Sequence, residues 1–255
     1  MDALRLDQVM AAAVFVGARI AGVLMFPPFL GSGAIPLPVK AGLTLALTGL
    51  LWPVVGVAAV EATPLGWLRV MGSETVIGLM LGLAMQFIFE AAQFAGQVVG
   101  VQTGFSLITI LDPQTQADTP VLGIFQQLVA LLIFFQLNVH HWLLRGLAAS
   151  FSYLPPGAWP SGRAGEGLLR AAGSIWLVGL EMAGPVIVAT LVADVALGFL
   201  GKVSPQLPVV FVGLSVKNLL GLAVLAGSFA LWPRLLEREF AAAIGWGERV
   251  LHLAR

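Results

Sequence analysis

The stretch Gln102–Pro120, QTGFSLITILDPQTQADTP, decides how the chain is interpreted, because it places polar residues between two long apolar segments. Four polar residues recur at every third position: Thr103, Ser106, Thr109 and Asp112. They form one narrow stripe if the segment is helical. Asp112-Pro113 then ends regular structure, because proline has no N–H and restricts the residue before it. Irregular polar backbone is tolerated at membrane depth only where protein or a water-filled cavity surrounds it.

The composition around this stretch is that of a polytopic membrane protein. Of the 255 residues, 58% are hydrophobic and 10% are charged, and the mean hydropathy is +0.95. An ordinary soluble domain is about 45–50% apolar and about 25% charged. The 13 basic and 13 acidic residues cancel, so no net charge indicates a nucleic-acid partner. The chain has no cysteine, which excludes disulfides and thiolate metal sites. Membrane lipid is the expected surrounding.

Six apolar segments are each long enough to cross a bilayer as a helix, for which roughly 20 residues suffice. They run approximately over residues 9–30, 41–60, 70–101, 121–147, 174–200 and 207–232. This pattern predicts an all-α fold, with residues 234–255 as an amphipathic helix at the membrane interface. With six crossings, nine arginines that lie outside the apolar runs or, like Arg145, near the end of one are on the same side, and only Lys40 and Lys202 lie on the other. The positive-inside rule then predicts that both termini are cytoplasmic.

The third segment, residues 70–101, is too long for a simple crossing, because at about 1.5 Å per residue it exceeds a hydrocarbon core of roughly 30 Å. One side carries a polar stripe: Gln86, Glu90, Gln93 and Gln97. The adjoining side carries glycines whose spacing lets another backbone approach: Gly78, Gly82, Gly96, Gly100 and Gly104. The segment is therefore either a tightly packed helix of a monomeric bundle or a helix of an assembly around a hydrated centre.

Six charged residues lie within or near the ends of apolar runs: Arg19, Glu74, Glu90, Glu181, Asp194 and Lys217. A charge at the bilayer centre costs about 2.5 kcal/mol or more, so such residues usually pair or face water. We interpret them as structural ion pairs. The alternative is an ion or proton path, but we find no internal repeat of the kind that many transporters have.

No catalytic or metal-binding constellation is found. The sequence has no H-E-x-x-H and no P-loop, and Gly213-Leu214-Ser215-Val216 lacks the glycine that completes a nucleophile elbow. His140 and His141 are adjacent, so we expect them to point to different sides of a helix and to be poor joint metal ligands. Nothing around Asp112 or Asp194 supports an aspartyl pair. We predict a non-enzyme without cofactor or metal.

Five stretches, taken in order, carry a resemblance to a known family. They are FPPFLGSGAIPLPVKAGLTLALT (26–48), ETVIGLMLGLAMQFIFEAAQFAGQVVGVQTGFS (74–106), ILDPQTQADTPVLGIF (110–125), LNVHHWLL (137–144) and SPQLPVVFVGLSVKNLLG (204–221). The ordered set resembles the FliR family, the R subunit of the flagellar type III export gate, which is related to the T subunit of virulence injectisomes. Asp112-Pro113-Gln114 and Asn138 with His140 favour the flagellar branch. Pro208 departs from the family, where asparagine is commoner.

This resemblance implies a fold, partners and a location. FliR-like subunits consist of long bent helical hairpins and join several P-type and Q-type subunits in a helical, cone-like gate. Residues 1–173 would form a P-subunit-like part and residues 174–255 a Q-subunit-like part of a single export-gate domain. The further partners implied are the B-type export switch subunit and unfolded flagellar protein substrates. The location implied is the bacterial inner membrane, at the flagellar basal body.

The resemblance also implies that the opening stretch is a plug that helps to close the channel. The expected plug and gate residues are Gly104, Phe105, Ser106, Leu107, Ile108, Ile110, Asp112, Pro113, Gln114 and Pro120. Their apolar members would seal the channel, as hydrophobic constrictions do elsewhere. The alternative is an exposed surface loop. For the whole chain, the alternatives are an ion-coupled membrane transporter, the equivalent injectisome subunit and, least supported, an intramembrane hydrolase.

Overall fold

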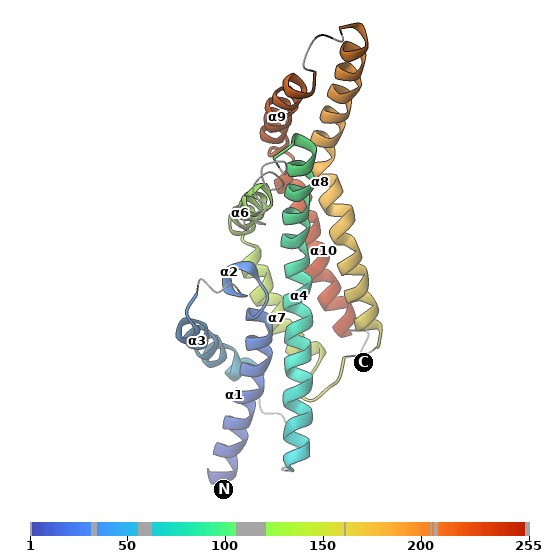
Figure 1. Cartoon of the computed structure of the whole chain (residues 1–255). Coiled ribbons are helices and arrows are strands. Elements are labelled where there is room, and N and C mark those ends of the chain that lie inside the picture. Colours follow the sequence, from blue (N-terminus) through green and yellow to red (C-terminus); the bar gives the residue numbers. More distant parts are fainter. Residues whose placement is uncertain are drawn as a thin grey trace. The chain divides into compact units, whose positions relative to one another are not determined.

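The computed structural model describes residues 2–31, 35–55, 63–105, 121–160, 162–204, 206 and 209–252 (Figure 1). Within these ranges the regular structure is helical and there is no strand. The helices are α1 (Asp2–Leu24), α2 (Pro28–Gly31), α3 (Leu37–Val55), α4 (Pro64–Thr103), α6 (Val121–Gln136), α7 (Val139–Tyr153), α8 (Gly162–Val203), α9 (Val209–Ser228) and α10 (Trp232–His252). The predicted all-α fold is confirmed.

Two helices in the described part are long and apolar enough to cross a membrane, namely α4 and the Ala164–Val203 portion of α8. Two bent pairs would each count as one further span: Val121–Gln136 with Val139–Tyr153, bent by 69°, and Val212–Ser228 with Trp232–Gly245, bent by 60°. Length and composition thus allow between two and four spans. The apolar parts of α1 and α3 are shorter. The long and bent apolar helices fit the predicted polytopic membrane protein, while the orientation of the termini stays a prediction.

The chain forms two compact units. Unit 1 comprises Met1–Phe87, Asn138–Ala172 and Arg238–Arg255, and unit 2 comprises Ile88–Leu137 and Gly173–Glu237. The helices α4, α8 and α10 each contribute to both units. The boundaries of these units differ from the predicted division into residues 1–173 and 174–255. The likeness of those two parts to P-type and Q-type subunits stays a prediction.

The core of unit 1 lies where α1, α3 and α7 meet. Every three or four residues α1 has a buried apolar side chain, so one stripe of the helix faces inward. The buried cluster consists of Val16, Ile20, Val23, Leu24, Leu147 and Phe151. Leu47, Leu51 and Trp52 of α3 pack against it. The two helices approach closely at Gly17, because a Cβ there would stand 3.2 Å from Thr48 Oγ1.

In unit 2, the second half of α4 packs against α6 and α8. The ring of Phe89 lies 5.6 Å from that of Phe134 on α6, and both side chains are buried. A Cβ on Gly179 of α8 would stand 3.0 Å from the carbonyl oxygen of Ala91. Small residues thus bring these helices together, as is common in membrane proteins.

Hydroxyl groups on the apolar helices are satisfied by the backbone of their own helix. Thr44 donates to Lys40 O at 2.8 Å, Thr48 to Thr44 O at 2.7 Å and Thr190 to Val186 O at 2.9 Å. Side-chain bonds of this type leave no unpaired donor on a surface that faces lipid or apolar protein. The polar residues on these helices are therefore compatible with an apolar environment.

Candidate functional site

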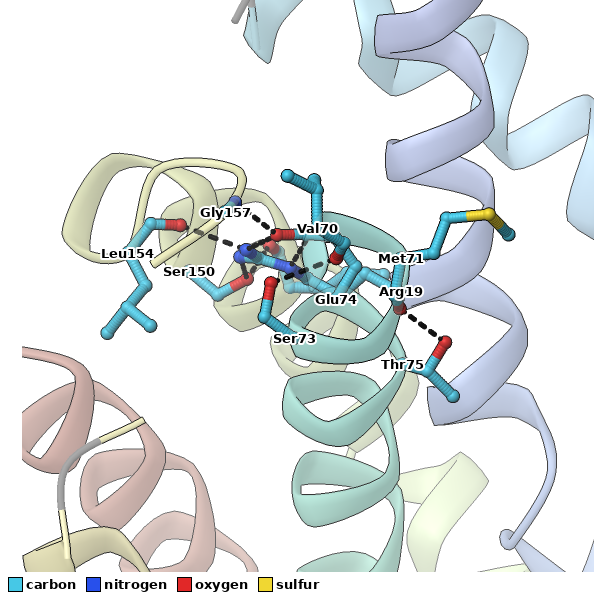
Figure 2. Close-up of polar contacts among 10 residues, drawn as sticks. Arg19, Val70, Met71, Ser73, Glu74, Thr75, Ser150, Leu154 and Gly157 are labelled. Carbon is cyan, nitrogen blue, oxygen red and sulfur yellow. Dashed lines mark hydrogen bonds and ion pairs between the residues drawn. The ribbon is translucent and has the colours of Figure 1, made fainter. Parts of the chain in front are cut away.

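A fully buried ion pair in unit 1 joins three parts of the chain (Figure 2). Arg19 of α1 donates from Nε to Glu74 Oε2 at 2.8 Å and from Nη2 to Glu74 Oε1 at 3.0 Å, across to α4. It also donates to Ser150 Oγ of α7 at 2.9 Å and to the carbonyl oxygen of Leu154 at 2.9 Å. Glu74 Oε1 accepts a further bond, at 3.2 Å, from the N–H of Gly157. We call these five residues the Arg19 cluster.

The Arg19 cluster forms because glycine lets α1 and α4 approach closely. A Cβ on Gly78 would collide with the carbonyl oxygen of Arg19, and a Cβ on Gly22 would stand 2.9 Å from Thr75 O. At this separation the arginine and glutamate side chains can meet in a bidentate pair. Gly157 has a φ of 91°, a conformation that glycine adopts at little cost, and this backbone turns its N–H toward Glu74.

The Arg19 cluster is built to hold structure together. Both charged side chains have zero exposure, so neither solvent nor a substrate contacts them. The arginine is satisfied by a carboxylate, a hydroxyl and a carbonyl, and its guanidinium carbon lies 4.0 Å from the centre of the Phe151 ring. Removing one partner of such a pair leaves an uncompensated buried charge, which costs about 3–5 kcal/mol. The cluster thus locks α1, α4 and the end of α7 into one arrangement.

A second ion pair, in unit 2, has different surroundings. Lys217 of α9 donates to Asp194 Oδ2 of α8 at 2.8 Å. The lysine side chain is 20% exposed and the aspartate side chain is 52% exposed. Glu181 of α8 is also exposed on the isolated chain. The predicted burial of Asp194 and Glu181 therefore depends on lipid or on other chains, and it stays a prediction.

The predicted packing glycines of α4 contact helices of the same chain. Gly78 and Gly82 meet α1, since a Cβ on Gly82 would stand 2.7 Å from the carbonyl oxygen of Val23. Gly96 meets α6, where a Cβ would collide with the carbonyl oxygen of Leu122. Gly100 is more open, with the nearest atom, Leu122 Cδ1, 3.9 Å from the position of a Cβ. The alternative of packing within one bundle thus accounts for Gly78, Gly82 and Gly96, and a role against other subunits stays a prediction.

The predicted polar stripe lies at the boundary between buried and exposed surface. Gln86, Glu90 and Gln93 are half-buried, and Gln97 is exposed. The helix ends just beyond it, at Thr103. Whether the stripe faces a hydrated centre stays a prediction.

Only the first residues of the predicted plug lie in the described part of the chain. Gly104 ends α4 with a φ of 86°, and its N–H donates to Val101 O at 3.2 Å. Phe105 is half-buried. The remaining plug residues lie outside the described residues: Ser106, Leu107, Ile108, Ile110, Asp112, Pro113, Gln114 and Pro120. The role of the segment stays a prediction.

Sequence reasoning missed the break in the fourth apolar segment. Asn138 adopts the left-handed conformation, with φ 55°, between α6 and α7. Asparagine tolerates the left-handed backbone conformation better than most residues. The Leu137-Asn138 pair inside an apolar run was therefore the sequence signal that could have predicted the break. The expectation that His140 and His141 point to different sides was wrong, because their ring centres lie only 4.2 Å apart in the first turn of α7.

The sequence predicted that the C-terminal amphipathic helix lies at the membrane interface with its apolar face in the lipid. For that apolar face the prediction was wrong. Leu236 and Phe240 of α10 are fully buried, so the protein itself covers the residues that would have entered the membrane surface. An amphipathic pattern does not distinguish a membrane surface from a protein surface as its partner.

No metal centre is found among the described residues, since no group of three or more histidine, aspartate or glutamate side chains is placed to hold an ion.

The residues that match known proteins make up almost the whole chain. Residues 10–243 match the family described as bacterial export proteins, family 1. Over 224 residues the chain is 32% identical to the flagellar biosynthetic protein FliR of Escherichia coli (strain K12), which covers 88% of this chain and 86% of that protein.

The chain belongs to the FliR family of bacterial export proteins. FliR of Bacillus subtilis (strain 168) is 29% identical over 210 residues, which is 81% of each chain. FliR of Aquifex aeolicus (strain VF5) is 27% identical over 242 residues, which is 94% of this chain and 93% of that protein. The resemblance seen in the sequence is thus confirmed. The charged residues of the Arg19 cluster and the Asp194–Lys217 pair lie within the range that matches the FliR family.

Proposed function

We propose that this protein is a structural and gating subunit of the flagellar type III secretion export gate. It would form, with P-type and Q-type subunits, the channel through which unfolded flagellar proteins cross the inner membrane at the basal body. A contact with the B-type export switch subunit belongs to the same proposal. The observation that carries it is the match to the export family over residues 10–243, together with near full-length relatives named as flagellar biosynthetic proteins.

The surface of α8 supports a role in an assembly. Only 17% of its most apolar stretch is buried within the chain, against 50% of the corresponding stretch of α4. Leu177, Leu191 and Phe199 are among its exposed side chains. So much exposed apolar surface indicates lipid or further subunits as its surroundings.

The proposed role is channel formation without catalysis. The tightest polar constellation in the described residues, the Arg19 cluster, is sealed from solvent and already satisfied. Such a cluster favours a structural component over an enzyme. An ion-coupled transporter would need a charged group that a passing ion can reach, and the half-exposed Asp194 is the residue that a transport test should include.

Within this function, the stretch Gln102–Pro120 is the proposed plug. It is polar, contains Pro113 and Pro120, and joins α4 to α6, so it is anchored at both ends. Deleting residues 106–116 should raise the ion conductance of cells that make the complex and slow their growth in high salt, because small ions leak through a gate without its seal. The complex must still assemble, which co-purification checks. Normal impermeability with an intact complex would instead identify this stretch as a surface loop.

Complementation tests the proposed function. Produced with its own P-type and Q-type subunits in a strain that lacks all three, the chain should restore swimming and secretion of hook and filament proteins. Glu166→Ala, at an exposed ion pair, should restore both equally well. Stable production without any secretion would contradict the flagellar role. Restoration of effector secretion in an injectisome strain, without flagellar secretion, would indicate the injectisome alternative.

A further inference from the structure

A fully buried amide group on α6 has no hydrogen-bond partner in the described part of the chain. The side chain of Gln126 has zero exposure, and neither its Oε1 nor its Nε2 atom makes a hydrogen bond there. An amide offers two N–H donors and one carbonyl acceptor. Folded proteins pair almost all such buried groups, because a buried polar group without a partner is destabilising. A different arrangement of unit 2 that gives Gln126 a partner would therefore gain a hydrogen bond.

A second polar group of unit 2 is in the same condition. Trp232, the first residue of α10, is buried, and its Nε1–H donates to none of the residues that the structure describes. Aromatic contacts connect this indole to α6. Its ring centre lies 4.8 Å from that of Phe229, which lies 6.0 Å from that of Phe125, the residue before Gln126. An unpaired donor and an unpaired amide thus belong to neighbouring parts of one packed cluster.

The break between α9 and α10 is where the separation of these two groups can change. Residues 229–231 separate the two helices, and Val212–Ser228 is bent by 60° against Trp232–Gly245. Changes in a few backbone angles at the end of a helix redirect the element that follows, as in hinge motions. Since Trp232 follows the break directly, such a change moves its indole relative to α6.

We propose that unit 2 has a second arrangement, used during export, in which the Nε1–H of Trp232 donates to Oε1 of Gln126. Another chain cannot supply the partner in the arrangement shown, because the Gln126 side chain has zero exposure. The second arrangement gains one hydrogen bond, which changes the ratio of the two arrangements by a factor of roughly two to ten. The proposal rests on the proposed function, since export is the activity that uses the second arrangement.

A double-mutant cycle on secretion tests the pairing. Gln126→Met replaces the amide by an apolar side chain of similar volume, and Trp232→Phe removes the indole N–H. Secretion of hook and filament proteins would be measured for both single variants and for the double variant, in the complementation strain with the partner subunits. Gln136→Met, at an exposed glutamine of the same helix, and Trp176→Phe, at a tryptophan that is 63% exposed, are the matched controls.

Each single variant should lower secretion by a factor of roughly two to ten, and the double variant should secrete as much as the weaker single variant. Both controls should secrete as the unchanged chain does. Losses that multiply in the double variant would overturn the pairing, as would full secretion by either single variant. Absence of secretion by the unchanged chain is a different result, because it would remove the proposed function on which the pairing rests.

Thermal unfolding of the purified full chain separates this role from a structural one. Gln126→Met should leave the melting temperature unchanged or raise it, because an apolar side chain replaces an unpaired buried amide. The proposal thus predicts a variant that secretes less although it is at least as stable as the unchanged chain. A lower melting temperature would show that Gln126 already makes hydrogen bonds in the arrangement shown, to ordered water for example, and would overturn the proposal.

Discussion

The Arg19–Glu74 and Lys217–Asp194 pairs share a shortest N–O distance of 2.8 Å but differ in their surroundings. The first is sealed within unit 1, with a hydroxyl, a carbonyl and an N–H completing its hydrogen bonds. The second lies between α8 and α9 of unit 2, and its carboxylate is half-exposed. The chain therefore buries one pair completely and leaves the other at its own surface. The N–O distance does not distinguish an ion pair that stabilises the fold from an ion pair at the surface, whereas the exposed fraction of the side chains does.

The largest effect is expected from breaking the Arg19 cluster. Glu74→Ala leaves Arg19 buried and unpaired, so we expect the free energy of unfolding to fall by about 3–5 kcal/mol. Thermal unfolding of the purified chain in detergent would measure the loss. The matched control Glu166→Ala should stay within about 0.5 kcal/mol, because its pair is exposed. Equal losses in both variants would show that the cluster does not lock unit 1.

The next largest effect is expected where α4 approaches its neighbours. Gly78→Ala and Gly96→Ala place a Cβ against a backbone carbonyl and should each destabilise the chain by about 1–3 kcal/mol. Gly49→Ala is the control, since a Cβ there meets nothing within 4 Å. Unfolding of the three variants under the same conditions compares them. Gly100→Ala sharpens the test. A loss of stability seen only in the presence of other subunits would show that Gly100 packs against another subunit.

A smaller effect is expected at the exposed pair. Asp194→Ala in the isolated chain should cost no more than about 1 kcal/mol, since a half-exposed ion pair contributes little. In the assembled complex the loss should be larger if another chain covers the pair. A double-mutant cycle with Lys217→Ala, carried out with and without partner subunits, separates the two contributions. A loss as large as that of Glu74→Ala in the isolated chain would erase the distinction between the pairs.

No change in stability is expected from labelling the termini, but their location is informative. Single cysteines at Asp2 and Arg255 should resist an impermeant maleimide added to intact cells, because the arginine distribution predicts that both ends are cytoplasmic. Opening the cells should restore labelling at both positions. Strong labelling from outside at either end would contradict the orientation.

Much of the fold follows from hydropathy, because long apolar runs in a chain of this composition form membrane-type helices. The length and close packing of α4 could be predicted from its glycines and its polar stripe. The pairing of Arg19 with Glu74 could not, since nothing local relates residues 55 positions apart. The bonds from Ser150 and Gly157 depend on how the end of α7 folds back. The break at Asn138 escaped notice because apolar residues continue on both sides of it.

The central claim is that this chain is one subunit of a multi-subunit export gate. The most direct measurement is native mass spectrometry of the complex purified through a tag on this chain, after production with its P-type and Q-type subunits. The account predicts a single complex that contains one copy of this chain with several copies of each partner, and a chain that is less stable when produced alone. A monodisperse monomer of unchanged stability, free of both partners, would contradict it.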